Sequence, residues 1–184
     1  MNLTDLPENL PAPIDDGAAS YLTGMTMPAI SFTATDHQNV NIKLLQGFTV
    51  IYIYPMTGRP GVPLPDNWDA IPGARGCTPQ SCGFRDQHNE FGKFNVQILG
   101  LSSQKTNDQL EAKERLHLPF ELLSDERLIL KERLQLPTFI AAGMELYKRI
   151  TLIVKDGVIV KVFYPIFPTG SNAEKVLSWF QSNT

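Results

Sequence analysis

The chain has 184 residues, of which 42% are hydrophobic and 19% charged, and its formal net charge is −3. This size and composition are typical of one globular domain with a single hydrophobic core. The small negative charge gives no reason to expect nucleic acid or an anionic membrane surface as a partner. No apolar run approaches the roughly 20 residues that a membrane-spanning helix needs. Residues 1–22 show no basic region followed by an apolar core, so we expect a cytoplasmic protein without a secretory signal.

Residues 1–24 are rich in proline, aspartate and small residues, and we expect an irregular arm on the surface of a single domain formed by residues 25–184. Within that domain, residues 30–32 and 40–42 alternate apolar and polar side chains around a turn-like stretch, which predicts a short hairpin. Residues 48–54 are β-branched or aromatic throughout and predict a central strand that is covered on both faces.

The segment 55–76 is rich in proline and glycine, at a density that neither a helix nor a central strand tolerates. We expect a long ordered loop, because Trp68 and Ile71 give it apolar surface to bury. Long ordered loops in compact domains are more often functional than not. The segment is therefore predicted to be a loop of the active site.

The rest of the chain alternates helices and strands. Pro79 suits the first position of a helix and Thr78 can be its N-cap, so a helix is predicted through residue 91. An Asp156-Gly157 turn between two alternating runs predicts a second hairpin. The other predicted elements are strands at 96–101, 120–123, 149–154 and 158–163, and helices at 106–116 (capped by Thr106 or Asn107), 125–133 and from Ser171 onward. This order predicts an α/β domain with a mixed central sheet flanked by helices.

Cys77 and Cys82 are the two cysteines of the chain. They cannot form the framework of a small disulfide-rich secreted protein, and only His88 is near enough in sequence to join them in a metal site. Redox chemistry or plain packing remains. Cys77 stands at the predicted start of a helix, where free backbone N–H groups and the helix dipole stabilise the reactive thiolate. Cys77 is therefore the predicted nucleophile, and a packing cysteine that happens to start a helix is the alternative.

The position of Cys82, five residues after Cys77, predicts a conformational change. In a continuous helix the two Cα atoms would lie about 8–9 Å apart, beyond the ~7 Å that a disulfide allows. A disulfide between them would require the first turn or two of the helix to unwind, and Gly83 makes this easier because glycine lowers helix propensity. The spacing favours a switch between a dithiol form and a locally unfolded disulfide form.

Residues 75–86, with the sequence RGCTPQSCGFRD, resemble the active-site helix of the peroxiredoxin Q group of peroxiredoxins, also called bacterioferritin comigratory proteins. In that group a Gly-Cys-Thr stretch, a second cysteine five residues on and a Phe-Arg-Asp run recur together. The resemblance covers most of the chain. It extends to YIYP at 52–55, LPF at 118–120, LLSD at 122–125 and RITLI at 149–153 with the Asp-Gly turn that follows.

This resemblance implies a thioredoxin fold with an N-terminal extension and a peroxidase without a bound cofactor or metal. By analogy, Cys77 would attack the peroxide, Cys82 would close an intramolecular disulfide, and thioredoxin or a similar dithiol protein would reduce it. Arg149 matches the arginine of the family, whose role would be to stabilise charge on the leaving oxygen. An edge-strand arginine in a surface ion pair is the alternative for Arg149, and the loop residues Arg59 and Arg75 are secondary candidates.

One position departs from the family pattern. Peroxiredoxins usually carry a proline and then a hydroxyl residue, the latter three positions before the reactive cysteine, but here these positions are Ala70 and Ala74. Pro55 and Thr57 are the expected substitutes, with the loop folding the Thr57 hydroxyl back beside Cys77. The alternative is that Thr57 only caps its strand. This departure leaves the reaction rate and the preferred peroxide open.

Three functions follow from these observations. The first is a peroxidase, and the second is a redox sensor or regulatory protein whose Cys77–Cys82 switch is recognised by a partner. The third is a non-catalytic relic of the fold with a structural disulfide. Fast recycling by a reductant separates a peroxidase from a sensor, which has no need of it. Because members of the resembled group are often monomeric, we expect a monomer or a weak dimer.

Overall fold

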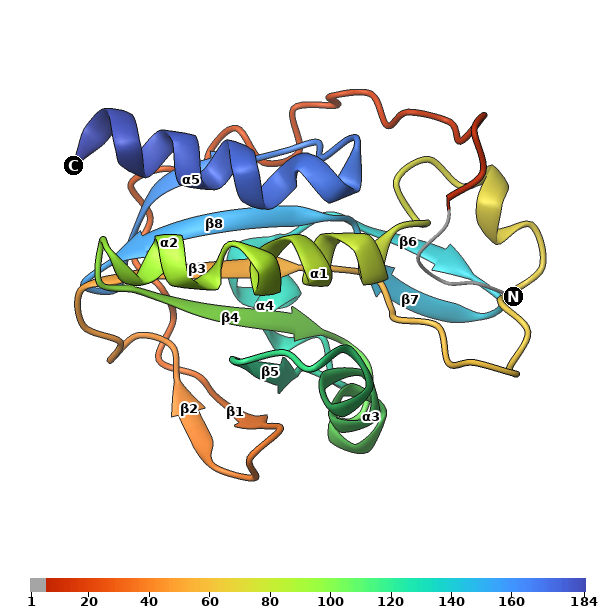
Figure 1. The fold of residues 1–184 in the computed structure, drawn as a ribbon, viewed down its shortest axis with the longest axis horizontal. Helices are drawn as coiled ribbons and strands as arrows, with labels where there is room; N and C mark the ends of the chain where they lie inside the picture. The colour runs from red at the N-terminus through yellow and green to blue at the C-terminus, as the bar shows by residue number, and fades with distance from the viewer. Residues whose placement is uncertain (1–5) are drawn as a thin grey trace.

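A computed structural model describes residues 6–184 (Figure 1). They form a seven-stranded sheet in the order β2-β1-β5-β4-β3-β8-β9 and a separate two-stranded sheet of β6 and β7. The strands are β1 (Ser31–Ala34), β2 (Asn39–Asn41), β3 (Phe48–Ile53), β4 (Val96–Ser102), β5 (Glu121–Ser124), β6 (Thr138–Ala141), β7 (Met144–Tyr147), β8 (Ile150–Lys155) and β9 (Val158–Phe163). The helices are α1 (Cys77–Asp86), α2 (His88–Gly92), α3 (Thr106–Leu116), α4 (Ile129–Leu134) and α5 (Asn172–Asn183), with 3₁₀ turns η1 (Trp68–Ala70) and η2 (Thr169–Ser171).

β3 lies in the middle of the main sheet because its side chains are suited to burial on both faces. Residues 49–53 of this strand are all buried. β3 runs parallel to β4 and antiparallel to β8. β4 is also parallel to β5, whereas β8 and β9 form an antiparallel hairpin. The sheet is therefore mixed, as the sequence predicts.

One face of the sheet is covered by α1 and α5, which lie over it side by side in Figure 1. Alternate residues of β3, Val50 and Tyr52, point to this layer. They share a buried cluster with Phe84 of α1 and Phe180 of α5. Fully burying each such side chain stabilises the fold by about 1.5–3 kcal/mol, so this packing holds α1 against the sheet.

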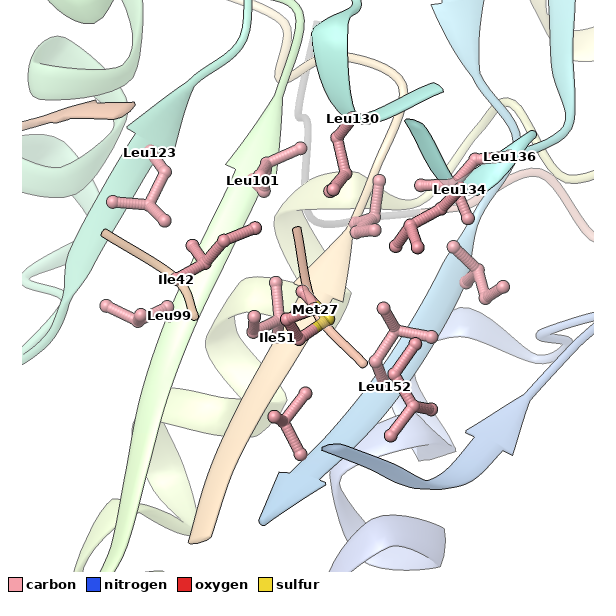
Figure 2. Packing of buried hydrophobic residues seen from close by; sticks show 14 of the residues in the cluster. Met27, Ile42, Ile51, Leu99, Leu101, Leu123, Leu130, Leu134, Leu136 and Leu152 are labelled. Atoms are coloured by element: carbon pink, nitrogen blue, oxygen red, sulfur yellow. The ribbon is translucent and has the colours of Figure 1, made fainter. Parts of the chain in front are cut away.

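The opposite face packs against α4 and the N-terminal segment. Ile51 of β3 and Leu152 of β8 lie with Leu130 of α4 in the cluster shown in Figure 2. Residues 6–24 contain no helix or strand, yet Ala19 and Leu22 are buried in the same cluster. The core therefore includes part of the segment that the sequence assigns to an arm, and the boundary at residue 24 stays a prediction.

Several elements confirm the predictions from the sequence. β1 and β2 pair as the first hairpin, and α3 has the predicted bounds. Asp156 and Gly157 form the turn between β8 and β9, with φ angles of 48° and 78°. These left-handed angles favour glycine and aspartate, and their backbone twist matches that of the flanking strands.

The predicted helix ends are wrong in several places. α1 begins at Cys77, and Gly76, with φ of 106°, is its N-cap in place of Thr78. The helix stops at Asp86, before the separate α2. Neither Thr106 nor Asn107 caps α3, whose N-cap is Lys105. These errors share a cause, because local sequence indicates which residues can cap a helix but not where tertiary packing starts it.

The start of α4 is also later than the predicted residue 125. The helix begins at Ile129, after Leu128 in a left-handed conformation. Asp125 still serves the helix start, because its carboxylate accepts hydrogen bonds from the backbone N–H groups of Ile129 and Leu130 at 2.8 and 2.9 Å. These bonds satisfy two of the amides that a helix leaves free at its N-terminus.

The hairpin of β6 and β7 was not predicted, and it explains how the 55–76 loop is held. Trp68 is buried, in a cluster with Ala74 of the loop and Leu146 of β7. Ile71 and Phe139 pack against this cluster. The prediction that Trp68 and Ile71 anchor the loop is confirmed, and their partner is this second sheet. No helix within residues 6–184 is long and apolar enough to cross a membrane.

Candidate active site

Cys77 is the first residue of α1, at the point where the proline-rich loop joins the helix. Gly76 makes this junction possible, since its φ of 106° is a conformation that L-residues with a Cβ rarely adopt. Cys77 is only 4% exposed. Its sulfur therefore sits beside the positive end of the helix dipole in a site from which most water is excluded.

Arg149 contacts the sulfur of Cys77. Its Nη2 atom lies 3.1 Å from Sγ, and the residue is only 3% exposed. The same nitrogen also faces the backbone carbonyls of Gly73, Ala74 and Arg75 at 3.2–3.4 Å. Arg149 forms no ion pair with a carboxylate of residues 6–184. A buried charge normally requires a partner, and the thiolate of Cys77 is the anion that this geometry can supply.

A chain of buried amides holds the guanidinium in place. Gln80, one turn after Cys77 on α1, accepts a hydrogen bond from Arg149 Nη1 through Oε1. Gln80 Nε2 donates to Asn172 Oδ1 at 2.9 Å, and Thr151 Oγ1 donates to the same oxygen at 2.8 Å. Asn172 opens α5 and Thr151 lies in β8, so three elements fix the direction in which Gln80 presents its oxygen to the arginine.

A small hollow of about 20 Å³ opens beside Cys77. Its lining comes from the loop and the start of α1: Met56, Gly58, Leu64, Trp68, Arg75, Gly76, Cys77 and Thr78. This volume admits little more than a water-sized group. A larger cavity of about 380 Å³ lies on another side of Arg149 and is not lined by Cys77.

The two loop arginines differ in their surroundings. Arg75 is buried, lines the hollow at Cys77 and pairs with Asp69 at 3.4 Å. Arg59 is half exposed and pairs with Asp108 at 3.4 Å on the surface. Of the secondary candidates from the sequence, the structure brings Arg75 to the hollow and leaves Arg59 outside it.

Thr57 does not line the hollow, although its neighbours Met56 and Gly58 do. Its hydroxyl donates instead to Gln104 Oε1 at 3.2 Å, and its backbone N–H donates to the same oxygen at 2.8 Å. Pro55 is buried at the end of β3, where its carbonyl accepts a hydrogen bond from Ser102 Oγ at 2.9 Å. The structure thus brings together Cys77 and Arg149, but not Thr57.

Cys82 lies in the second turn of the same helix, and both thiols are free. It is partly exposed. Burial raises the pKa of the Cys82 thiol above its ordinary value, and the nearby Arg85 guanidinium opposes this only in part. Cys82 is therefore protonated at neutral pH in this conformation, and the thiol is a weaker nucleophile than the thiolate.

Sequence reasoning missed Gln80, Thr151 and Asn172. The only signal in the sequence concerns Thr151, a polar residue between apolar neighbours in the run RITLIV. Their contacts join residues 21 and 92 positions apart. Local patterns do not report contacts of that separation.

Comparisons with known proteins agree with this arrangement. The model of the Redoxin family matches residues 22–177. Peroxiredoxin Bcp of Escherichia coli (strain K12) is 30% identical over 165 residues, covering 87% of this chain and 96% of that protein. Chloroplastic peroxiredoxin Q of Suaeda salsa is 25% identical over 165 residues, covering 89% of this chain and 70% of that protein.

Solved structures of the same group share the fold. Peroxidoxin BcpB of Mycobacterium tuberculosis superimposes with a TM-score of 0.71 at 22% identity, covering 88% of this chain and 97% of that one. The bacterioferritin comigratory protein of Xanthomonas campestris, described for its alkyl peroxide reduction activity, gives 0.66 at 18% identity and covers 86% of this chain and 96% of that one. The predicted thioredoxin fold, with its mixed sheet between layers of helices, is confirmed.

Proposed function

The chain belongs to the redoxin family, in its peroxiredoxin Q and Bcp group, and from this premise we propose that it is a thiol-dependent peroxidase in which Cys77 attacks the peroxide and Cys82 resolves the product. The observation that carries the proposal is the 3.1 Å contact between Arg149 Nη2 and Cys77 Sγ in a buried site. A cation held there by neutral groups is fully available to a thiolate and to the oxygen that leaves.

In the first step the Cys77 thiolate attacks one peroxide oxygen and the O–O bond breaks. The sulfur becomes a sulfenic acid, and the other oxygen takes a proton and leaves as water or an alcohol. Negative charge moves from sulfur to the leaving oxygen during this step. Arg149 stabilises both ends of that movement with N–H donors that are already oriented by Gln80 and the loop carbonyls.

In the second step the thiol of Cys82 attacks the sulfenic sulfur, a disulfide forms and water leaves. Both cysteines are in α1, and at about 8–9 Å their Cα atoms are too far apart for a disulfide. The first turns of α1 therefore unwind before the bond forms. A dithiol protein of the thioredoxin type then reduces the disulfide by exchange and becomes oxidised itself.

The preferred peroxide is an open part of the proposal. The small size of the hollow at Cys77 favours hydrogen peroxide over larger peroxides, whereas the relative from Xanthomonas campestris is described for its alkyl peroxide reduction activity. Both classes are therefore the substrates to test. A cytoplasmic location and a monomeric or weakly dimeric state stay predictions from the sequence.

The test is peroxide consumption by the purified protein with thioredoxin, its reductase and NADPH, using hydrogen peroxide and cumene hydroperoxide. Wild type should turn over, Cys77→Ser should be inactive, and Cys82→Ser should complete about one turnover and stop. Absence of consumption above background in wild type would contradict the proposal. Rapid oxidation of Cys77 without recycling by any dithiol would favour a sensor instead.

A further inference from the structure

Thr169 of η2 has a hydroxyl group without a partner. The residue is only 1% exposed, and its Oγ1 makes no hydrogen bond within residues 6–184. A buried hydroxyl that loses water without gaining a partner destabilises the conformation that buries it. Such groups are rare in native proteins, and each requires an explanation.

The neighbours of Thr169 are the first two turns of α1. A Cβ atom at Gly76, the N-cap of α1, would lie 2.1 Å from Thr169 Oγ1, so the hydroxyl sits directly against the glycine backbone. The next residue, Gly170, approaches the second turn in the same way, since its carbonyl oxygen would lie 3.1 Å from a Cβ at Gly83. η2 therefore packs closely against the part of α1 that runs from Cys77 to Cys82.

Thr169 is not a substitute for the hydroxyl that the family places beside the reactive cysteine. Cys77 Sγ makes hydrogen bonds with Arg149 Nη2 and with the carbonyl of Ala74. The hydroxyl of Thr169 makes no hydrogen bond with the sulfur, so its effect must act through α1.

We propose that the unpartnered hydroxyl of Thr169 weakens the start of α1 in the dithiol protein and thereby promotes the unwinding that lets Cys77 and Cys82 form a disulfide. The inference rests on the proposed function, because it concerns the second step of that mechanism. When the first turns of α1 unwind, Gly76 leaves Thr169, and the hydroxyl regains hydrogen bonds to water. In the form with α1 intact the hydroxyl makes no such hydrogen bonds. Thr169 is therefore a positioning residue that sets the equilibrium between the form with α1 intact and the unwound form.

The chain offers a matched control. Thr49 Oγ1 is the other threonine hydroxyl within residues 6–184 that is buried without a partner. Thr49 lies in β3 opposite Gln97 and Val154, and its strand parity places it with Ile51, on the face of the sheet away from α1. Replacing either threonine by valine removes one unpartnered hydroxyl and keeps the shape of the side chain.

The experiment measures the thiol–disulfide equilibrium of the full chain in mixtures of reduced and oxidised dithiothreitol, without peroxide. In this exchange two electrons and two protons pass from Cys77 and Cys82 to the oxidised dithiothreitol, which becomes the dithiol. Thr169→Val should shift the equilibrium toward the protein dithiol by about 5- to 30-fold, the range of a single buried polar group. Thr49→Val should stay within about twofold of wild type.

Hydrogen exchange of the reduced protein provides a second measurement. The backbone N–H groups of residues 77–83, a segment in which Pro79 has none, should exchange more slowly in Thr169→Val by a similar factor, and those of Thr49→Val should match wild type. An equilibrium of Thr169→Val equal to that of wild type would overturn the proposal, as would an equal shift in Thr49→Val. If wild type forms no Cys77–Cys82 disulfide at all, the proposed resolving step fails as well, which distinguishes the two failures.

Discussion

Replacing Arg149 by methionine should slow the oxidation of Cys77 by peroxide about 100- to 1,000-fold. Methionine is of similar length and fills the buried space, but it removes the positive charge and every N–H donor. The Nη2 atom of Arg149 donates a hydrogen bond to Cys77 Sγ over 3.1 Å. The loss should appear in the first chemical step, in which Cys77 attacks the peroxide.

The magnitude follows from the geometry. A hydrogen bond to a charged group contributes about 1.5–3 kcal/mol, and loss of one preoriented donor to a developing anion costs about 2.7–4 kcal/mol of transition-state stabilisation. Each 1.36 kcal/mol is a factor of ten in rate. Arg149 is nine-tenths or more buried and is held by Gln80 and three loop carbonyls. It therefore needs little reorganisation during the reaction, and the range of about 2.7–4 kcal/mol applies.

The assay is stopped-flow fluorescence after mixing the reduced protein with peroxide. Trp68 lines the hollow beside Cys77, so its emission should respond to oxidation of the sulfur. Arg59→Met is the control, because Arg59 is half exposed and pairs with Asp108 on the surface. It should leave the rate within about twofold, since exposed ion pairs contribute little. Thermal unfolding of each variant checks that the protein is folded.

Arg149→Lys separates charge from shape. Lysine keeps the charge but has no planar fork to reach Gln80, the loop carbonyls and the sulfur together, so it should recover only part of the lost rate. The reasoning would be refuted if Arg149→Met remained within about threefold of wild type while folding normally. The arginine would then brace the loop without taking part in the reaction.

Three further results are expected. Thr57→Val should lower the free energy of unfolding by about 1 kcal/mol, the usual contribution of one hydrogen bond. Because the Thr57 hydroxyl bonds to Gln104, the rate of Cys77 oxidation, measured by stopped flow, should change less than about threefold. A large loss of rate would mean that Thr57 turns toward the sulfur during the reaction. Hydrogen bonds from Lys148 and Tyr164 lower the pKa of Asp16 to about 2. The contribution of Asp16 to stability should therefore be present above pH 3.8 and lost as the pH falls toward 2. In urea unfolding, Asp16→Asn should lose less stability over that range, and a dependence of the unfolding free energy on pH equal to that of wild type would contradict the assignment. Because burial raises the pKa of the Cys82 thiol above 9.0, the reduced protein should lose stability as the pH rises above that value, and Cys82→Ser should remove this part of the alkaline loss in the same measurement.

The sequence predicts much of this molecule because its strongest signals are local. The β-branched and aromatic run at 48–54 can only be a strand buried on both faces, and it forms the centre of the sheet. The Asp156-Gly157 turn sets the last hairpin in the same way. The hairpin of β6 and β7 escaped prediction because Ala142-Gly143 is a weaker turn signal and the flanking runs contain few β-branched residues.

In the active site, too, the features set by local sequence could be predicted and the others could not. The position of Cys77 at a helix start could be predicted from the proline and the polar residues around it, although the N-cap is Gly76 and not Thr78. The parity of the backbone after β3 could not be predicted, because the strand ends at Ile53 and the loop no longer alternates regularly. It places Met56 and Gly58, instead of Thr57, along the hollow.

Within residues 6–184 Arg149 has no carboxylate partner, and this links the fold to the proposed chemistry. An aspartate or glutamate beside the guanidinium would stabilise it, but it would also cancel the field that the thiolate and the leaving oxygen require. The fold uses neutral dipoles instead: the carbonyls of Gly73, Ala74 and Arg75 and the amide of Gln80. These dipoles accept hydrogen bonds from Nη1 and Nη2 and leave the net charge in place, whereas Nε has no hydrogen-bond partner within residues 6–184. The loop has Ala74 where the family has a hydroxyl residue, but it still contributes to the site through its backbone carbonyls. These carbonyls can orient Arg149 only if the loop is held in place, and the burial of Trp68 against the second sheet holds it.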